Sequence, residues 1–251
     1  EKLRVLIKNS DIVINLVGIL YETKKQKFED IHAKFPDLLS KLCSELNIKK
    51  LVHISALGIN ETVSSQYMQS KLNGEKKIIN NFDRSVILRP SVIFGPEDKF
   101  FNQFASLAEF FPALPLIGGG LTYFQPIYVG DVAKSIMTVL EKEEINNNIY
   151  ELGGPQTFTF KELMKILLKE INKKRFLVSV PFLFAKFQAK ILQLLPKPLL
   201  TTDQVEMLKY DNIVTNKYPT LKDLKINPKT IESILPNYIW RFRKGGQFAK
   251  L

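Results

Sequence analysis

The sequence DIVINLVG, at residues 11–18, decides the fold. It is a short and nearly continuous apolar run that ends in glycine, a pattern typical of a strand buried on both faces of a sheet. Two similar runs follow, KLVHIS at 50–55 and SVIL at 85–88, and helical stretches at about 28–46 and 65–82 separate the three. Strands separated in this way pair in parallel through right-handed crossovers. The sequence therefore predicts an α/β fold with a doubly wound parallel sheet.

The chain is predicted to divide after residue 155, and residues 156–251 are predicted to form a smaller, mostly helical lobe. Within this lobe the clearest alternating stretch is short, at 176–180, and LPKPL at 195–199 is the best candidate for a linker. Upstream of it, three consecutive glycines at 118–120 predict a flexible loop before the next strand.

Capping signals mark the helices of the lobe. Capping boxes at Thr159–Glu162 and Thr201–Gln204 predict one helix that continues to Asn172 and another that ends near Lys209. Asn227, followed by Pro228, predicts a third cap, and the helix that it opens should end before Pro236.

The charge and the residue counts restrict the classes of function. Subtracting 25 acidic from 36 basic residues gives a net charge of +11, which favours an anionic partner such as a phosphate-bearing ligand, a membrane surface or an acidic protein. Nucleic acid is the weaker explanation, because the basic residues are spread along the chain without a binding motif. A single cysteine, Cys43, and two histidines, His32 and His53, leave neither a disulfide framework nor an expected metal site.

Residues 180–195 (VPFLFAKFQAKILQLL) form a basic amphipathic stretch. Lys186, Lys190 and Gln193 share one side of the predicted helix. The apolar residues at helical spacing are Leu183, Phe184, Phe187, Ile191, Leu194 and Leu195. Two interpretations remain open: a helix that lies on an anionic membrane or docks on a protein partner, and a core-facing helix with a solvated basic side.

Tyr67 and Lys71 carry the first candidate chemistry. They lie four residues apart on the helix after the second predicted strand, so phenol and ammonium share one helical face. A lysine in this position can lower the pKa of a tyrosine from about 10 and make it a general acid for a carbonyl or hydroxyl beside a nicotinamide. An exposed pair without a function is the alternative, and the motif needs support from its surroundings.

That support comes from motifs that resemble the extended and atypical short-chain dehydrogenase/reductase superfamily, of the NAD-dependent epimerase/dehydratase type. They follow in order within residues 10–165: Asn15 to Gly18, His53 to Ser55, Tyr67 to Lys71, Gly74-Glu75, Arg89 to Pro96, Gln125 to Ala133 with its aspartate Asp131, and Tyr150 to Gly154. The resemblance implies a Rossmann-like sheet, with residues 1–155 as a partial NAD(P)-binding domain. It also implies NADP(H), or NAD, as the cofactor.

The resemblance further implies roles for single residues. Tyr67 would be the catalytic acid and Lys71 would hydrogen-bond the cofactor ribose, and both catalytic roles are interpreted as vestigial. His32 takes a position where related proteins often carry an asparagine that supports the lysine, although a satisfied helix histidine is the alternative. The residues implied to bind the cofactor are Leu16, Val17, Gly18, Ser55, Tyr67, Lys71, Pro90, Ser91, Val92 and Ile93. His53 and Cys43 are interpreted as buried structural residues.

Two departures from the family pattern weaken an enzymatic interpretation. None of the 12 glycines falls in the glycine-rich turn that receives a pyrophosphate at a helix N-terminus, and the resemblance places that turn and its strands before Glu1. We therefore expect the 251-residue chain alone to bind NADPH weakly or not at all. The paired serines of active members fall on Ser55 and Ala56, and the catalytic one is usually the second. Its replacement by alanine removes a hydrogen-bond donor whose loss costs on the order of 10²-fold in turnover.

Two C-terminal stretches, 199–214 and 233–246, resemble the Rossmann-fold accessory subunit family of respiratory complex I, the NADH:ubiquinone oxidoreductase, and its bacterial homologues. This resemblance implies a non-catalytic, NADPH-holding accessory or assembly subunit whose partners are complex I subunits. It implies a location in the mitochondrial matrix or the bacterial cytoplasm, peripheral to the inner membrane. Two alternatives remain open: an active NAD(P)-dependent reductase or epimerase of unknown substrate, and a quinone- or lipid-associated assembly factor without nucleotide.

Overall fold

A computed structural model describes residues 1–142 and 149–246 of the chain. Its first part is a four-stranded sheet in the order β1-β2-β3-β8, and every neighbouring pair is parallel. The strands are β1 (Ile12–Asn15), β2 (Lys50–Ile54), β3 (Ser85–Pro90) and β8 (Ile149–Leu152). The predicted α/β fold with a parallel sheet is confirmed.

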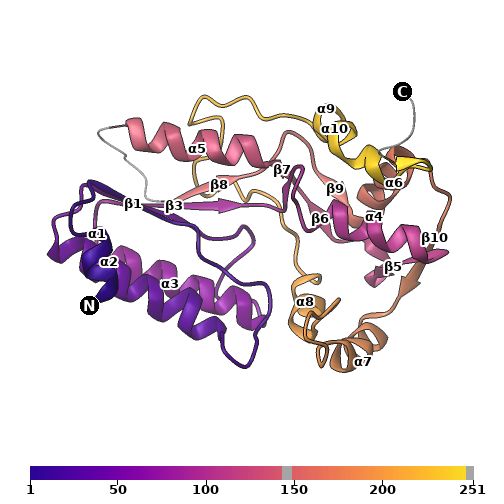
Figure 1. The fold of residues 1–251 in the computed structure, drawn as a ribbon, viewed down its shortest axis with the longest axis horizontal. Helices are drawn as coiled ribbons and strands as arrows, with labels where there is room; N and C mark the ends of the chain where they lie inside the picture. Colours follow the sequence, from indigo (N-terminus) through magenta and orange to yellow (C-terminus); the bar gives the residue numbers. More distant parts are fainter. Residues whose placement is uncertain (143–148, 247–251) are drawn as a thin grey trace.

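Helices cover both faces of this sheet (Figure 1). One face carries α2 (Phe35–Glu45) and α3 (Gln66–Asn81), and the other carries α5 (Val129–Glu141). Neighbouring residues of β2 serve the two faces, because Leu51 packs into the core under α2 and α3 while Val52 packs into the core under α5. Cys43, on α2, is completely buried in the first of these cores, as the sequence predicted. The short α1 (Lys2–Ile7) packs against α2.

The long helix predicted over 28–46 contains two kinds of helical turn. Glu29–Lys34 is π-helical, and α2 follows it directly. The π-helical segment approaches α3 so closely that a β-carbon on Gly74 would lie 1.9 Å from the carbonyl oxygen of His32. Only glycine fits at this contact.

Within the described residues the first strand is covered on one face. β1 is an edge strand of the described sheet. Ile12 and Ile14 are exposed on the face opposite to α2 and α3. On the opposite face Val13 packs against the core of α2 and α3. An apolar run shows that a strand is present, but it cannot show which faces neighbouring elements cover.

A second core joins residues from both sides of the boundary predicted at 155. α4 (Phe101–Phe110) and α6 (Phe160–Glu170) share it, together with α9 (Ile231–Ile234) and α10 (Pro236–Ile239). Beside these helices β5 (Ala113–Ile117) pairs in parallel with β10 (Phe176–Val180), which confirms the strand expected there. In return Leu221, Leu224 and Ile226 pack into the core between the sheet and α5. The chain therefore crosses repeatedly between the two cores.

The capping predictions for the lobe hold at two helices and fail at a third. Thr159 and Thr201 form the predicted capping boxes of α6 and of α8 (Thr202–Met207). The predicted cap at Asn227 is wrong, because α9 starts at Ile231 and the side chain of Thr230 accepts the hydrogen bond from Ser233 N. Nor does the helical region end at Pro236, because a proline needs no hydrogen bond at the first position of a helix and here it opens α10.

Short elements connect the two cores. The parallel pair β4 (Ile93–Phe94) and β7 (Ile127–Tyr128) leads into α5, and the antiparallel pair β6 (Tyr123–Phe124) and β9 (Phe158–Thr159) leads into α6. The strand-to-helix segment expected over 125–133 is present. Gly118–Gly120 form a single 3-10 turn between β5 and β6 in which all three residues have positive φ.

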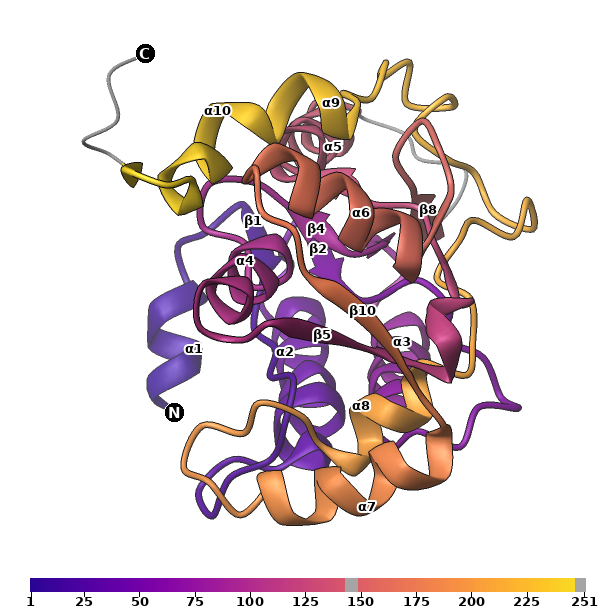
Figure 2. The same cartoon turned by 90° about the vertical axis from the view of Figure 1, so that its right-hand side faces the viewer.

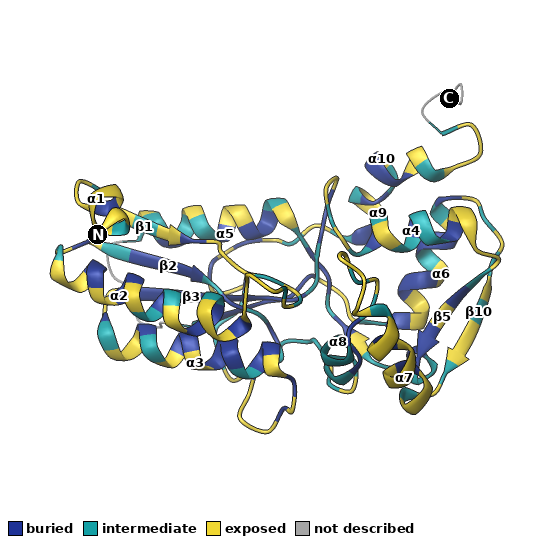
Figure 3. Ribbon diagram, turned by 60° about the horizontal axis from the view of Figure 1, so that its bottom comes forward, coloured by how far each residue is buried: buried dark blue, intermediate teal, exposed yellow. Residues whose placement is uncertain are grey.

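The amphipathic stretch forms α7 (Phe182–Leu192), and its apolar side faces outward. Figure 3 shows most of this helix as exposed. Leu183, Phe184, Phe187 and Ile191 are between 58% and 79% exposed, whereas the small residues Ala185 and Ala189 are buried against the lobe. The interpretation of a core-facing helix is therefore wrong. In the described part of the chain no helix is long and apolar enough to cross a membrane.

The exposed edge of β1 leads to the first prediction. In the 251-residue chain expressed on its own, Ile14→Lys should change the free energy of unfolding by no more than about 0.5 kcal/mol, since the side chain is exposed there, and should reduce self-association, because a charge on a sheet edge discourages pairing with another chain. Light scattering against time measures the association. Val13→Lys is the matched control on the opposite face and should lower the melting temperature; self-association unchanged by Ile14→Lys would contradict the prediction.

Candidate functional site

The carboxyl ends of the first three strands bring the predicted site residues to one edge of the sheet. β1 leads into Leu16, Val17 and Gly18, β2 leads into Ser55, and β3 ends at Pro90. The loops stay in register beyond the strands, since Leu57 N donates to the carbonyl of Pro90 at 2.9 Å. Parallel sheets bind ligands at this edge.

Lys71 extends from α3 to this edge. Its side chain is buried, and Nζ donates to the carbonyl oxygen of Ile54 at 3.2 Å. Burial lowers the pKa of Lys71 to about 8, an effect that the nearby carboxylate of Glu75 opposes. Gly18 lies beside the ammonium, because a β-carbon on this glycine would be 3.5 Å from Nζ. The structure thus brings together Lys71, the end of β1 and the end of β2.

Tyr67 lies one helical turn before Lys71, with Nζ 5.8 Å from the centre of the phenol ring. Phe28 and His32 contact the ring edge to face, with centroids 5.8 and 5.2 Å away. Burial in this aromatic cluster raises the pKa of Tyr67 well above its usual value, and the charge of Asp203 adds to the shift. The pKa shift of Tyr67 is thus opposite to the lowering expected from Lys71, and burial is its main cause.

His32 holds the loop after β1 rather than bonding Lys71 directly. Its Nε2 accepts from Ile19 N at 3.0 Å, so the ring proton lies on Nδ1, which faces Ser70 Oγ at 3.0 Å. Ser70 Oγ then donates to the carbonyl of Tyr67 at 2.8 Å. A neutral imidazole therefore links the loop at Gly18–Ile19 to the helix that carries Tyr67 and Lys71.

His53 pairs with the neighbouring strand. It lies opposite Asn15 in the β1–β2 register, and Nδ1 is 2.9 Å from Asn15 Nδ2. Burial is the main cause that lowers the pKa values of both His32 and His53 to about 3.

The buried ion pair of Arg89 and Glu75 fixes α3 against β3. Arg89 Nε donates to Glu75 Oε1 at 3.0 Å and Nη2 to Oε2 at 2.5 Å, and both side chains are buried. The guanidinium also lies over the ring of Tyr218, 4.8 Å from its centre. A two-point ion pair of this kind sets the height of α3 along the sheet, and with it the position of Lys71.

Ala56 takes the place where the family pattern has its second serine. Its methyl group packs against the cluster of Phe28, Tyr67 and Met68, so no hydroxyl is available at this point. Ser55 Oγ is buried and, within the described residues, has no hydrogen-bond partner.

Val92 packs against the core of α4 and α6, and Ile93 packs against the core under α5. Asn212 Oδ1 accepts from Ser91 Oγ at 2.6 Å and from Val92 N at 3.1 Å. Ile93 pairs with Ile127 in the small β4–β7 sheet. The side chain of Ser91 is therefore engaged by the protein. Sequence reasoning did not single out Asn212, because an amide that bonds backbone from distant segments leaves no local pattern.

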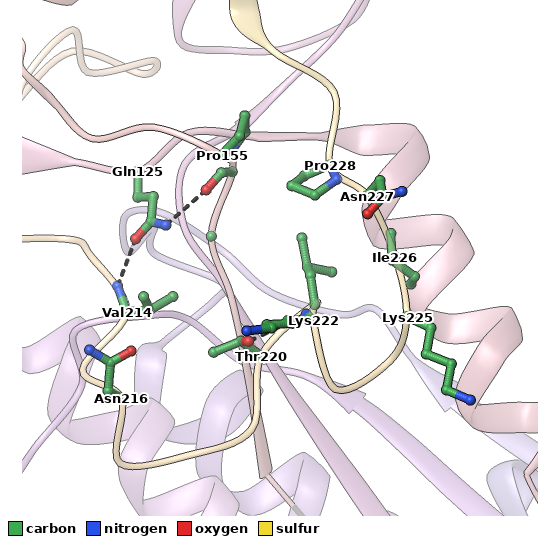
Figure 4. Close-up of a pocket in the computed structure, with 13 residues that line it drawn as sticks. Gln125, Pro155, Val214, Asn216, Thr220, Lys222, Lys225, Ile226, Asn227 and Pro228 are labelled. Atoms are coloured by element: carbon green, nitrogen blue, oxygen red, sulfur yellow. Dashed lines mark hydrogen bonds between the residues drawn. The ribbon is translucent and has the colours of Figure 1, made fainter.

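A second polar feature lies at the end of β8. Figure 4 shows the amide of Gln125 between two chain segments, donating to the carbonyl of Gly154 at 2.8 Å and accepting from Val214 N at 3.0 Å. Beside it opens a cleft of about 720 Å³ that the segment 214–228, with Lys222 and Lys225, helps to line. None of the predicted cofactor-binding residues lines this cleft.

The residues present at the edge fit the ribose half of a nicotinamide dinucleotide. The Lys71 ammonium has three donors, and the carbonyl of Ile54 accepts from one position, so it can also donate to ribose hydroxyls. The unpartnered hydroxyl of Ser55 at the same strand end is a second polar group of the kind that a bound ligand satisfies. The dinucleotide would supply hydride chemistry, and these residues would hold and orient it.

The two buried histidines make stability depend on pH. Their folded pKa values of about 3 lie below the unfolded value of about 6.5, so the unfolded chain binds more protons between these values. Stability should therefore fall as pH drops below about 6.5, approaching about 1.4 kcal/mol per pH unit for each histidine. His32→Gln should roughly halve this slope, since His53 remains. Urea unfolding at several pH values tests it; an equal slope in both proteins would show that His32 does not stay neutral.

Comparisons with known proteins agree with this geometry. The sequence pattern of the family described as NAD dependent epimerase/dehydratase family matches residues 1–153. Among solved structures, a dTDP-glucose 4,6-dehydratase from Bacillus anthracis in complex with NAD superposes with a TM-score of 0.67 at 19% identity, covering 95% of this chain and 75% of that one. A dTDP-4-dehydrorhamnose reductase from the same organism in complex with NADP gives 0.64 at 15% identity, covering 94% and 82%. These likenesses show the fold.

Curated relatives are similar over nearly the whole chain. The mitochondrial NADH dehydrogenase [ubiquinone] 1 alpha subcomplex subunit 9 of Arabidopsis thaliana is 31% identical over 98% of this chain. The mitochondrial NADH-ubiquinone oxidoreductase 40 kDa subunit of Neurospora crassa is 27% identical over 96% of it. The chain spans 64% of the length of each of these relatives. The sheet, the Tyr67–Lys71 pair at its carboxyl edge and the match over residues 1–153 together show that this chain belongs to the NAD dependent epimerase/dehydratase family.

Proposed function

We propose that the chain is a non-catalytic accessory or assembly subunit of NADH:quinone oxidoreductase, respiratory complex I, and that it holds a nicotinamide dinucleotide. The observation that carries the proposal is Ala56, whose methyl group packs against Tyr67 where the family has a hydroxyl donor, while Lys71 remains at the strand ends. The site thus retains groups that bind a ribose and lacks one that polarises a substrate oxygen. NADP(H) is the proposed cofactor, with NAD as the alternative.

The titration of the pair supports holding over turnover. Burial keeps Tyr67 protonated at physiological pH, so its phenol can donate a hydrogen bond but is a poor proton acceptor. Lys71, with a pKa of about 8, is still mostly charged near neutral pH and can donate to ribose oxygens. A phenol whose ionised form is disfavoured by burial can hold a ligand oxygen through a hydrogen bond but gives up its proton to a substrate less readily.

The relatives support complex I as the setting. The two relatives described above are mitochondrial subunits of NADH dehydrogenase and of NADH-ubiquinone oxidoreductase. We propose complex I subunits as partners and the mitochondrial matrix as the location, with the bacterial cytoplasm as the alternative.

We also propose that the outward side of α7 rests on an anionic membrane surface. Leu194 and Leu195 extend the exposed apolar residues of α7, while Lys190 and Lys197 are exposed beside them. An apolar strip with basic neighbours is the pattern of helices that lie in the lipid headgroup region. The net charge of +11 adds long-range attraction to such a surface.

Three basic side chains that could otherwise serve as docking charges already have partners in the fold. Lys186 pairs with Glu206 at 2.9 Å, Arg241 donates to Asn102 Oδ1 at 2.7 Å, and Arg243 donates to the carbonyl of Glu170 at 2.6 Å. Tests of docking should therefore change the apolar side chains.

Retention of the dinucleotide is the direct test of the site. Lys71→Met should weaken it about 10- to 150-fold, because a hydrogen bond from a charged group contributes about 1.5–3 kcal/mol. The measurement is the nucleotide released from the full-length protein purified from its own cells, with alkali used to extract NADPH and NADH and acid used to extract NADP+ and NAD+. Lys76→Met is the matched control, since Lys76 lies on the same helix and pairs at the surface with Glu61. Equal nucleotide content in both variants would contradict the proposed site.

Turnover separates the proposal from the alternative of an active reductase or epimerase. The same protein should not oxidise NADPH with carbonyl substrates, and Tyr67→Phe should alter nucleotide retention more than any rate. NADPH oxidation that Tyr67→Phe abolishes would establish the enzyme instead.

The α7 surface is tested by its two phenylalanines. Phe184→Ser with Phe187→Ser should leave the melting temperature nearly unchanged, because both side chains are exposed, and should weaken binding to anionic vesicles at least about a hundredfold, since burial of each contributes about 1.5–3 kcal/mol. Sedimentation with vesicles of phosphatidylcholine and phosphatidylglycerol measures it. Lys190→Gln should cost only about fivefold, because one basic residue contributes about 1 kcal/mol. A double variant that binds vesicles as tightly as the original would assign α7 to a protein partner.

A further inference from the structure

The N-terminus of α3 is capped by a side chain that comes from the distant helix α8. Asp203 Oδ1 accepts from Gln66 N at 2.7 Å and Oδ2 from Tyr67 N at 3.1 Å. Oδ2 also accepts from the hydroxyl of Ser65, the buried residue at the cap position, at 2.9 Å. A carboxylate at this point satisfies free backbone donors and interacts favourably with the positive end of the helix dipole.

These bonds fix the backbone of the residue that carries the phenol. Tyr67 N is one of the three donors, and Lys71 follows one turn later on the same helix. Met207 and Tyr210, at the end of α8 and just after it, pack against the cluster that contains Tyr67. A displacement of α8 would therefore move the N-terminal turn of α3 and loosen the packing around the phenol.

The opposite side of α8 packs against α7. Val205 is completely buried with Ala185 and Ala189, the small residues on the inner side of α7. Glu206 joins all three parts, because its carboxylate bonds Lys186 of α7 at 2.9 Å and Ser64, just before α3, at 2.7 Å. Figures 1 and 2 both show α8 between α7 and α3.

We infer that Asp203 is a positioning residue of the dinucleotide site, through which occupancy of that site and docking of the α7 surface favour each other. The inference rests on the proposed function, since it needs both the nucleotide and the anionic surface. A surface that holds α7 holds α8 with it, and α8 fixes the first turn of the helix that presents Tyr67 and Lys71. By thermodynamic linkage each ligand must then raise the affinity for the other by the same factor.

The test measures both affinities in the full-length protein, each with and without the other ligand. The probes are NADPH and vesicles of phosphatidylcholine and phosphatidylglycerol. We expect NADPH to tighten vesicle binding at least about fivefold, and the vesicles to tighten NADPH binding by the same factor. Asp203→Asn should bring this factor close to one while vesicle binding without NADPH is unchanged.

Asp223→Asn is the matched control, because Asp223 accepts from Thr220 N in a comparable local cap away from α3 and α8. Asp223→Asn should keep the full coupling factor. If it lost the coupling as Asp203→Asn does, a general loss of stability would explain both results. If Asp203→Asn does not fold, Glu206→Gln gives the same measurement through the bonds to Lys186 and Ser64, and should also reduce the factor.

Two results would overturn the inference, and they can be told apart. If the unmodified protein binds both NADPH and vesicles but independently, the coupling through Asp203 is wrong and the proposed function stands. If it binds only one of the two, the proposed function fails in that part and the inference fails with it.

Discussion

The hydrogen bonds of Asn212 join the strand ends of the parallel sheet to the C-terminal part of the chain. Its side chain donates to the carbonyl of Leu57, after β2, and accepts from Ser91 and Val92, after β3. Its backbone N–H donates to the carbonyl of Tyr123, the first residue of β6, and its carbonyl accepts from Gln125 N, just after β6. One residue thus satisfies backbone groups from several separate segments, which would otherwise need water at the centre of the fold.

The geometry of the edge follows from this constraint. The chain can cross repeatedly between the cores because Asn212 holds the ends of the strands at a fixed distance from the C-terminal segment. Asp131 supplies a similar link on the far side of the sheet, where its buried carboxylate accepts from Lys229 N at 2.7 Å. Polar side chains therefore set the relative position of the cores, and apolar packing then fixes each core internally.

The sequence predicted the elements well because their signals are local. Apolar runs located β2 and β3, and capping boxes located α6 and α8, since each signal lies within the element that it marks. The resemblance located the Tyr67–Lys71 pair and the missing hydroxyl at Ala56. The exposed face of β1, the outward side of α7 and the raised pKa of Tyr67 depend instead on what packs nearby in space. Asn212 and Asp203 were not found for the same reason, because their partners are remote in the chain.

The thiol of Cys43 reports whether the core between the sheet and the helices α2 and α3 is closed. Cys43 is the single cysteine of the chain, it is completely buried, and burial raises the pKa of its thiol to about 11, so it is almost unreactive toward alkylating reagents while the fold is closed. The rate of alkylation at Cys43 therefore depends on how often the layer of α2 and α3 opens. Because the core around α4 and α6 contains no thiol, its separate fluctuations leave that rate unchanged, so alkylation reports on the α2 and α3 layer alone.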